Sequence, residues 1–209
     1  MNCWRWLVFG TAWWLVIGVG SVQAHGFNLG FLTPLSGPDS RLGREAVNGF
    51  LLATRERDGH AFEESDGHLG GLDSFVIMID TGRSIEAVRS HLDTLQKGEG
   101  IVFLTGVSVA DILTATDVTL DEAQTVLVDP VNTAIYPAAI STSDSLVTMD
   151  GVPYLTAFLE AYGHEPGPYA IQGYIAARLI DVAVSAVEGK FSRRDVLQDA
   201  LEKARQKLP

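Results

Sequence analysis

Short apolar runs alternate with longer amphipathic segments between residues 28 and 130. The runs are continuous and bounded by glycine, proline or serine, which is typical of strands buried on both faces. Between them, apolar residues recur at helical spacing, which predicts helices with one buried face. This alternation predicts an α/β fold of three αβα layers around a mainly parallel sheet. The predicted strands are 29–32, 75–80, 101–106 and 125–130, and the helices between them begin before Leu42, at Ser84 and at Ser108, the last one ending at Glu122.

The remainder of the chain is predicted to be mostly helical. Tyr154, Phe158 and Tyr162 are spaced four residues apart and form an aromatic stripe on one helix. A longer helix is predicted over 169–189, with apolar residues along one side. A final helix is predicted to start at Ser192, because Ser192 and Asp195 match a capping pattern.

The first 24 residues have the pattern of a cleaved signal peptide. Arg5 precedes an apolar run over 7–20, and a small-residue cleavage pattern ends at Ala24. The alternative is an uncleaved membrane anchor, but the run is shorter than the roughly 20 residues that a spanning helix needs. We therefore expect a periplasmic protein with one domain over 25–209 and no membrane-spanning segment after cleavage.

Composition excludes several function classes. The net charge is −11, and no cluster of lysine and arginine interleaves with aromatics, so a nucleic-acid partner is not expected. The only cysteine, Cys3, lies in the leader. The chain carries no Gly-x-Ser-x-Gly elbow, phosphate loop or His-Glu-x-x-His motif, so we expect neither an enzyme nor a bound cofactor.

Several segments together resemble one family. The strand, Ser-Gly-Pro turn and helix over 29–53 look like the opening of the periplasmic type I solute-binding proteins, the branched-chain amino-acid (Leu/Ile/Val-binding) receptors of ABC importers. The segments 70–82, 103–133 and 154–189 are similar to later parts of that family, including a Gly-Tyr-x-Ala-Ala helix at 173–177. The family has two lobes. The units of the second lobe are missing here, so the resemblance implies one lobe assembled from segments 25–142 and 145–209.

The resemblance also implies a site and its partners. It places ligand-binding groups at Ser36, Ser108, Val131 and Thr133, with a small polar solute such as an amino acid and an ABC permease as partners. Independently of the family, hydroxyls and free N–H groups at a helix N-terminus can hold a small anion. The alternative for Ser108 is that it only caps its helix. Asp111 and Asp129 would repel a carboxylate, and a single lobe supplies only one wall, so we expect weak binding or binding with a partner.

Three further interpretations stay open. The face that the lost lobe would have covered could dock another periplasmic protein, which an exposed apolar patch near Tyr136, Pro137 and Ile140 would favour. Two Asp-Gly-His motifs, which end at His60 and His68, could attract a divalent metal, although a solvated acidic loop explains them as well. His25 would become the new N-terminus after cleavage and could chelate copper.

Overall fold

The computed structural model describes residues 26–56, 64–98, 100–130 and 146–206. Its centre is a five-stranded sheet in the order β2-β3-β1-β4-β5. The neighbouring pairs are parallel except β2 with β3, which are antiparallel. The predicted α/β class with a mainly parallel sheet is therefore confirmed. The strands are β1 (Gly26–Thr33), β2 (His68–Leu69), β3 (Leu72–Asp80), β4 (Phe103–Gly106) and β5 (Val126–Leu127).

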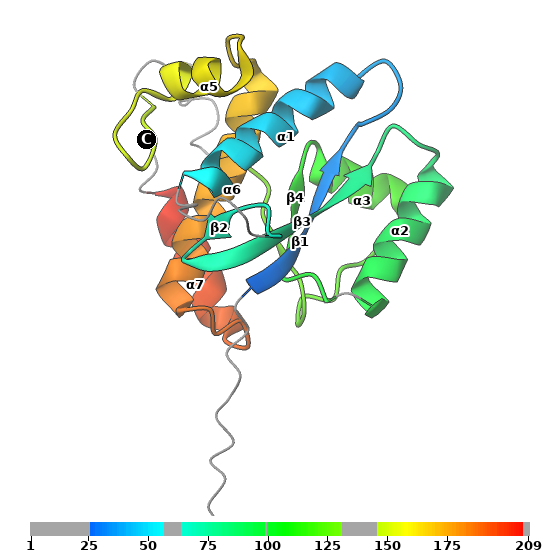
Figure 1. The fold of residues 1–209 in the computed structure, drawn as a ribbon. Helices are drawn as coiled ribbons and strands as arrows, with labels where there is room; N and C mark the ends of the chain where they lie inside the picture. The colour runs from blue at the N-terminus through cyan, green and yellow to red at the C-terminus, as the bar shows by residue number, and fades with distance from the viewer. Residues whose placement is uncertain (1–25, 57–63, 99, 131–145, 207–209) are drawn as a thin grey trace, which may run out of the picture.

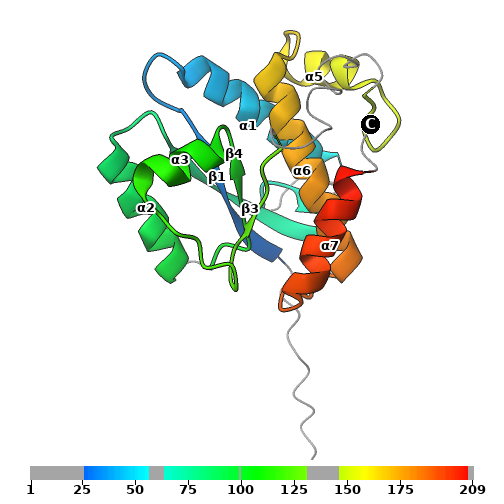
Figure 2. The same cartoon turned by 180° about the vertical axis from the view of Figure 1, so that it is seen from behind.

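Helices cover both faces of the sheet, as Figures 1 and 2 show. One face carries α1 (Ser40–Arg55), α6 (Pro168–Val187) and α7 (Arg194–Arg205), and α5 (Tyr154–Tyr162) lies beyond α1. The other face carries α2 (Ile85–Gly98) and α3 (Val109–Thr116). Successive side chains of a strand point to opposite faces of the sheet. Phe31 of β1 therefore packs into the core under α1, α6 and α7, and Leu32 packs into the core under α2. The three αβα layers are thus confirmed.

Helix α6 lies at the centre of the larger core. It packs beside both α1 and α7, and its buried residues are spread around the helix rather than confined to one stripe. By length and composition alone α6 could cross a membrane, contrary to the expectation that no segment after the leader could. However, 78% of its most apolar window is buried inside the fold, which is typical of a core helix.

Helices α1 and α6 touch through their backbones. A Cβ added to Gly49 would lie 1.8 Å from the carbonyl oxygen of Ala170, and one added to Gly173 would lie 2.0 Å from that of Ala46. Only glycine permits this approach at the two positions. The contact holds the late helices against the early half of the chain, so the two segments build one layer together.

Several predicted boundaries were wrong. Helix α3 ends at Thr116 rather than Glu122, because Asp117 turns into the left-handed conformation and its N–H caps the last carbonyls. Strand β5 is limited to Val126–Leu127 instead of 125–130. Helix α7 begins at Arg194 with Arg193 as its N-cap residue and no side-chain cap, so Ser192 does not start it.

One hairpin was not predicted from the sequence. β2 pairs with the beginning of β3, which starts at Leu72 rather than Phe75, and Gly70-Gly71 form the turn between them. The Asp181 carboxylate on α6 accepts a hydrogen bond of 2.8 Å from the N–H of Gly70. The leader and its boundary at Ala24 fall outside the described residues, so they stay predictions.

Candidate functional site

The carboxyl ends of β1, β3 and β4 meet at one edge of the sheet, where a groove of about 440 Å³ opens between their loops. In open α/β sheets, ligands bind beyond the carboxyl ends of the strands. Ser36 enters the groove after β1, Gly82 after β3 and Ser108 after β4. The remaining lining residues are Pro34, Pro38, Asp39, Leu42, Thr81, Val107, Ile112 and Tyr169.

Asp80, the last residue of β3, organises the loop after β1. Its Oδ1 accepts hydrogen bonds from the backbone N–H groups of Leu35 (2.8 Å), Ser36 (3.0 Å) and Gly82 (3.0 Å). Burial acts to raise the pKa of this carboxyl, but the Ser36 hydroxyl and the three N–H groups outweigh burial and lower it to about 2. The ionised carboxylate thereby fixes where Ser36 lies relative to the end of β3.

Ser108 occupies an unusual backbone conformation at the mouth of the groove. Its φ of 51° lies in the left-handed region, and it occupies the N-cap position of α3 without a side-chain capping bond. The interpretation that its hydroxyl only caps the helix is therefore wrong. A residue other than glycine in this region is strained, and such residues concentrate at functional sites. The exposed hydroxyl remains available to a ligand.

The backbone beneath Ser108 is also constrained. Gly106 has a φ of 136°, and a Cβ there would lie 2.0 Å from the carbonyl oxygen of Leu32. The buried amide of Gln172 on α6 donates a hydrogen bond of 3.2 Å to the carbonyl of Gly106. Helix α6 therefore supports the loop that carries Ser108, which links the late segment of the chain to the groove.

The structure brings two of the four predicted ligand-binding residues together. Ser36 and Ser108 line the same groove, whereas Val131 and Thr133 lie outside the described residues. Sequence reasoning missed the organising role of Asp80 and the contribution of Tyr169 from the start of α6. An Asp-Thr-Gly turn that directly follows a buried strand was the available signal for Asp80.

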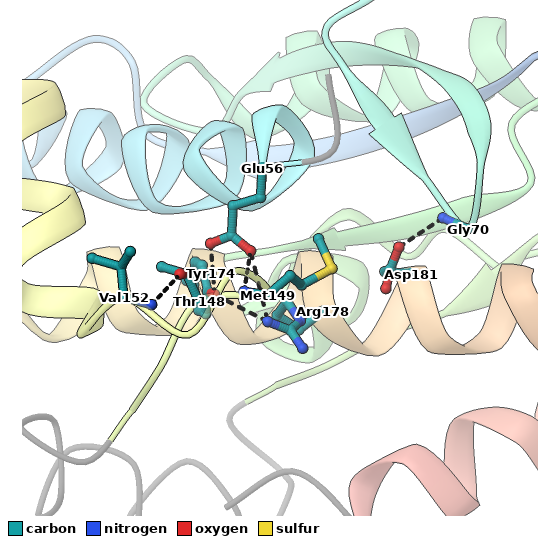
Figure 3. Close-up of polar contacts among 8 residues, drawn as sticks. All are labelled: Glu56, Gly70, Thr148, Met149, Val152, Tyr174, Arg178 and Asp181. Atoms are coloured by element: carbon teal, nitrogen blue, oxygen red, sulfur yellow. Dashed lines mark hydrogen bonds and ion pairs between the residues drawn. The ribbon is translucent and has the colours of Figure 1, made fainter. Parts of the chain in front are cut away.

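A second polar cluster, drawn in Figure 3, is buried between α1 and α6. Glu56 accepts hydrogen bonds from the Tyr174 hydroxyl at 2.7 Å and from the Met149 N–H at 3.0 Å. The Arg178 guanidinium lies 3.7 Å from the same carboxylate and donates to the Tyr174 hydroxyl at 3.1 Å. Burial raises the pKa of Glu56 even though these hydrogen bonds and Arg178 oppose the shift. The cluster ties the segment before α5 to α1 and α6.

The histidine motifs do not form a metal site in the described part of the chain. His68 Nε2 lies 2.8 Å from Asp73 Oδ1 on the adjacent strand, and the described residues contain no group of three or more His, Cys, Asp or Glu side chains placed to hold a metal. His60, Glu63 and His25 lie outside the described residues, as do Tyr136, Pro137 and Ile140 of the predicted docking patch.

Comparison with known proteins finds similarity in structure but not in sequence. No family model and no curated protein matches the sequence. Among solved structures, the chain is similar to the solute-binding protein of an ABC transporter from R. palustris in complex with benzoate, with a TM-score of 0.57 and 13% identity over 84% of this chain and 85% of that one. The chain has the fold of ABC-transporter solute-binding proteins.

A second solute-binding-type structure supports the same assignment of fold. The ABC-transporter substrate-binding protein from Sphaerobacter thermophilus aligns with a TM-score of 0.56 and 15% identity, again over 84% of this chain and 85% of that one. The two comparisons bear on the fold alone, so the assignment to one lobe of a type I periplasmic binding protein stays what the sequence resemblance implies. The Leu/Ile/Val specificity that the sequence resemblance implied stays a prediction.

Proposed function

We propose that this chain is an exported, non-catalytic binding module of the solute-binding-protein type, which holds a small polar solute such as an amino acid in the groove. The observation that carries the proposal is the convergence of Ser36 and Ser108 on one groove at the carboxyl ends of three strands. The shared fold with ABC-transporter solute-binding proteins supports it. Its compartment would be the periplasm, and an ABC permease is the proposed receiving partner.

Binding by this chain alone should be weak. Ser36 and Ser108 are exposed, so their hydrogen bonds to a solute compete with water and contribute about 1 kcal/mol each. Solute pockets gain most of their affinity by enclosing the ligand between walls. We therefore infer a millimolar-range interaction for the isolated chain, which a partner that covers the groove would strengthen.

Backbone-amide NMR titration tests the proposal. Amino acids and small carboxylates, benzoate included, are added to the purified protein, and shifts are followed at Gly82 and Ser108. The matched variant is Ser108→Gly, because glycine keeps the left-handed backbone and removes the hydroxymethyl group. We expect it to weaken binding by about threefold to tenfold. Ser192→Ala, in the exposed turn before α7, is the control and should bind normally.

Shifts that cluster away from the groove, or equal affinities for Ser108→Gly and the control, would argue against the groove as the binding site. Absence of any shift at millimolar concentrations would argue against solute binding altogether.

A second candidate function is docking of another envelope protein. Val147 and Val152 are 47% and 39% exposed, and they flank one turn because Val147 pairs with Pro153. Exposed apolar side chains that gather at one place can mark an interaction surface. A photo-crosslinking residue at position 152 would capture one defined partner in intact cells if this candidate is correct, and the same residue at the exposed position 199 would not.

A further inference from the structure

The described lining of the groove carries a negative charge and no positive one. Among the described residues that line it, Asp39 is the only charged one. Asp111, in the first turn of α3 beside Ser108, is also exposed. Neither carboxylate forms an ion pair with another described residue. Asp111 also offsets the partial positive charge that the N-terminus of α3 would otherwise offer to an anion.

The nearest arginines do not supply the missing cation. Arg83 Nε lies 3.5 Å from the Asp80 carboxylate, which it neutralises. On α1, Arg41 Nη1 lies 2.8 Å from Glu45 Oε1, and Arg44 is turned toward Ser40 Oγ at 3.4 Å. A carboxylate that entered the groove would therefore meet the Asp39 carboxylate and no lysine or arginine among the described lining residues.

The rest of the groove is suited to an apolar body. Pro34, Leu42, Val107 and Ile112 contribute aliphatic surface, and the half-buried Tyr169 contributes an aromatic ring. Hydroxyls of Ser36, Thr81 and Ser108 accept hydrogen bonds from an N–H donor as readily as they donate to an oxygen. The volume of about 440 Å³ is within the range of small-molecule sites.

We propose that the groove selects small cationic amines with an apolar or aromatic body over carboxylates of the same shape. This inference rests on the proposed function, since it names the substrate class of the same groove. It separates this chain from the benzoate-bound solute-binding protein to which its fold is similar. The overall net charge of −11 acts in the same direction, because it concentrates cations near the surface.

Three probes of matched shape test the preference: benzylamine, benzyl alcohol and benzoate, each titrated into the purified protein at neutral pH and low salt. We expect benzylamine to bind about twofold to fivefold more tightly than benzyl alcohol, and benzoate to bind more weakly than the alcohol. The difference between amine and alcohol should shrink in high salt, because the carboxylates are exposed to solvent.

The variant Asp39→Asn assigns the effect to the groove. Asp39 makes no side-chain cap on α1, so the substitution removes a charge without removing a capping bond. It should lower the ratio of amine to alcohol affinity by about twofold to fivefold. Asp199→Asn, an exposed charge on α7, is the matched control for net charge and should leave the ratio unchanged.

The outcomes separate the two proposals. If benzoate binds at the groove as tightly as benzylamine, or if Asp39→Asn behaves like Asp199→Asn, solute binding stands and the amine preference is overturned. If none of the three probes shifts the resonances of Gly82 and Ser108 at millimolar concentrations but the amino acids of the first titration do, the preference fails and the proposed function stands. If neither set shifts them, both fail.

Discussion

At the scale of single residues, Asp80 connects the sheet to the groove. Its carboxylate collects three backbone N–H groups from the loops after β1 and β3, and its side chain is 16% exposed. Hydrogen bonds to an ionised carboxylate stabilise the charged form, and the lowered pKa of about 2 expresses this. Loss of the charge should therefore loosen the loop that carries Ser36.

We predict that Asp80→Asn lowers the free energy of unfolding at neutral pH by about 1–2 kcal/mol. The pKa of Asp80 falls from 3.8 to about 2 on folding, so its contribution is present above pH 3.8 and is lost as the pH falls through about 2. Urea unfolding of both proteins across this range measures the difference, which should decline toward acid. A difference that does not change with pH would mean that the charge is not what stabilises the loop.

The site residues show which part of the groove the sequence could predict. Ser36 and Ser108 were named from the resemblance to the solute-binding family, and the argument from the N-terminus of a helix supported hydroxyls at such positions independently. The left-handed backbone of Ser108 was not predicted, since serine has no preference for that region. The link between Asp80 and residues 35 and 36 crosses more than 40 positions of sequence, and no local pattern indicates such a contact.

At the scale of elements, the contact between α1 and α6 determines how closely the late helices approach the sheet. Gly49 and Gly173 each face a backbone carbonyl of the other helix, as described above. A side chain at either position would collide with backbone, which cannot move aside as a flexible side chain can. The sequence placed glycine inside both predicted helices, where glycine usually destabilises a helix. A glycine at such a position often has a packing reason, and here that reason is the close approach of the two helices.

We predict that Gly173→Ala destabilises the protein by about 3 kcal/mol or more, because α1 and α6 must separate to admit the methyl group. Gly98→Ala is the matched control: its Cβ would meet nothing within 4 Å at the end of α2, and it should be neutral or stabilise by up to about 1 kcal/mol. Thermal and urea unfolding measure both variants. Equal stability of the two would show that the helices can separate without cost.

The elements also differ in how well the sequence predicted them. Helices α1 and α2 and strand β1 were predicted because a strong periodicity or a continuous apolar run is bounded by turn residues. The two-residue strands β2 and β5 are held by pairing with their neighbours rather than by their own pattern. Helix α3 stops at Thr116 because Asp117 adopts the left-handed conformation. Aspartate adopts this conformation more readily than most residues, but the sequence does not require it at this position.

At the scale of the whole molecule, two stretches far apart in sequence complete one layered fold. The alternation of strands and helices predicted the parallel sheet and its two covered faces. It did not predict that a buried ionic cluster would close the larger layer. Glu56 contacts Met149 and Tyr174, which lie 93 and 118 positions further along the chain, and such pairs leave no periodic signal.

The Glu56 cluster yields a prediction about how the late segment of the chain is held against α1. Glu56→Ala should lower the free energy of unfolding by about 2–4 kcal/mol, because it leaves the Tyr174 hydroxyl, the Met149 N–H and the Arg178 guanidinium without their acceptor. The Tyr174 hydroxyl and the Met149 N–H donate to different carboxylate oxygens, so Glu56→Gln keeps an acceptor for one of them and sets its NH2 group against the other. It avoids burying a charge, and we expect it to cost about 1–2 kcal/mol at neutral pH, less than Glu56→Ala.

The pH dependence of stability separates the contribution of the Glu56 hydrogen bonds from that of its buried charge. Because burial raises the pKa of Glu56 above its ordinary 4.5, the group's favourable contribution is full below pH 4.5 and is lost as the pH rises through the raised value. The stability of the unsubstituted protein relative to Glu56→Gln should therefore increase as the pH is lowered from 7 toward 4.5, as measured by urea unfolding. If Glu56→Gln instead proves as damaging as Glu56→Ala at neutral pH, the ion pair with Arg178, rather than the hydrogen bonds, holds the late segment in place.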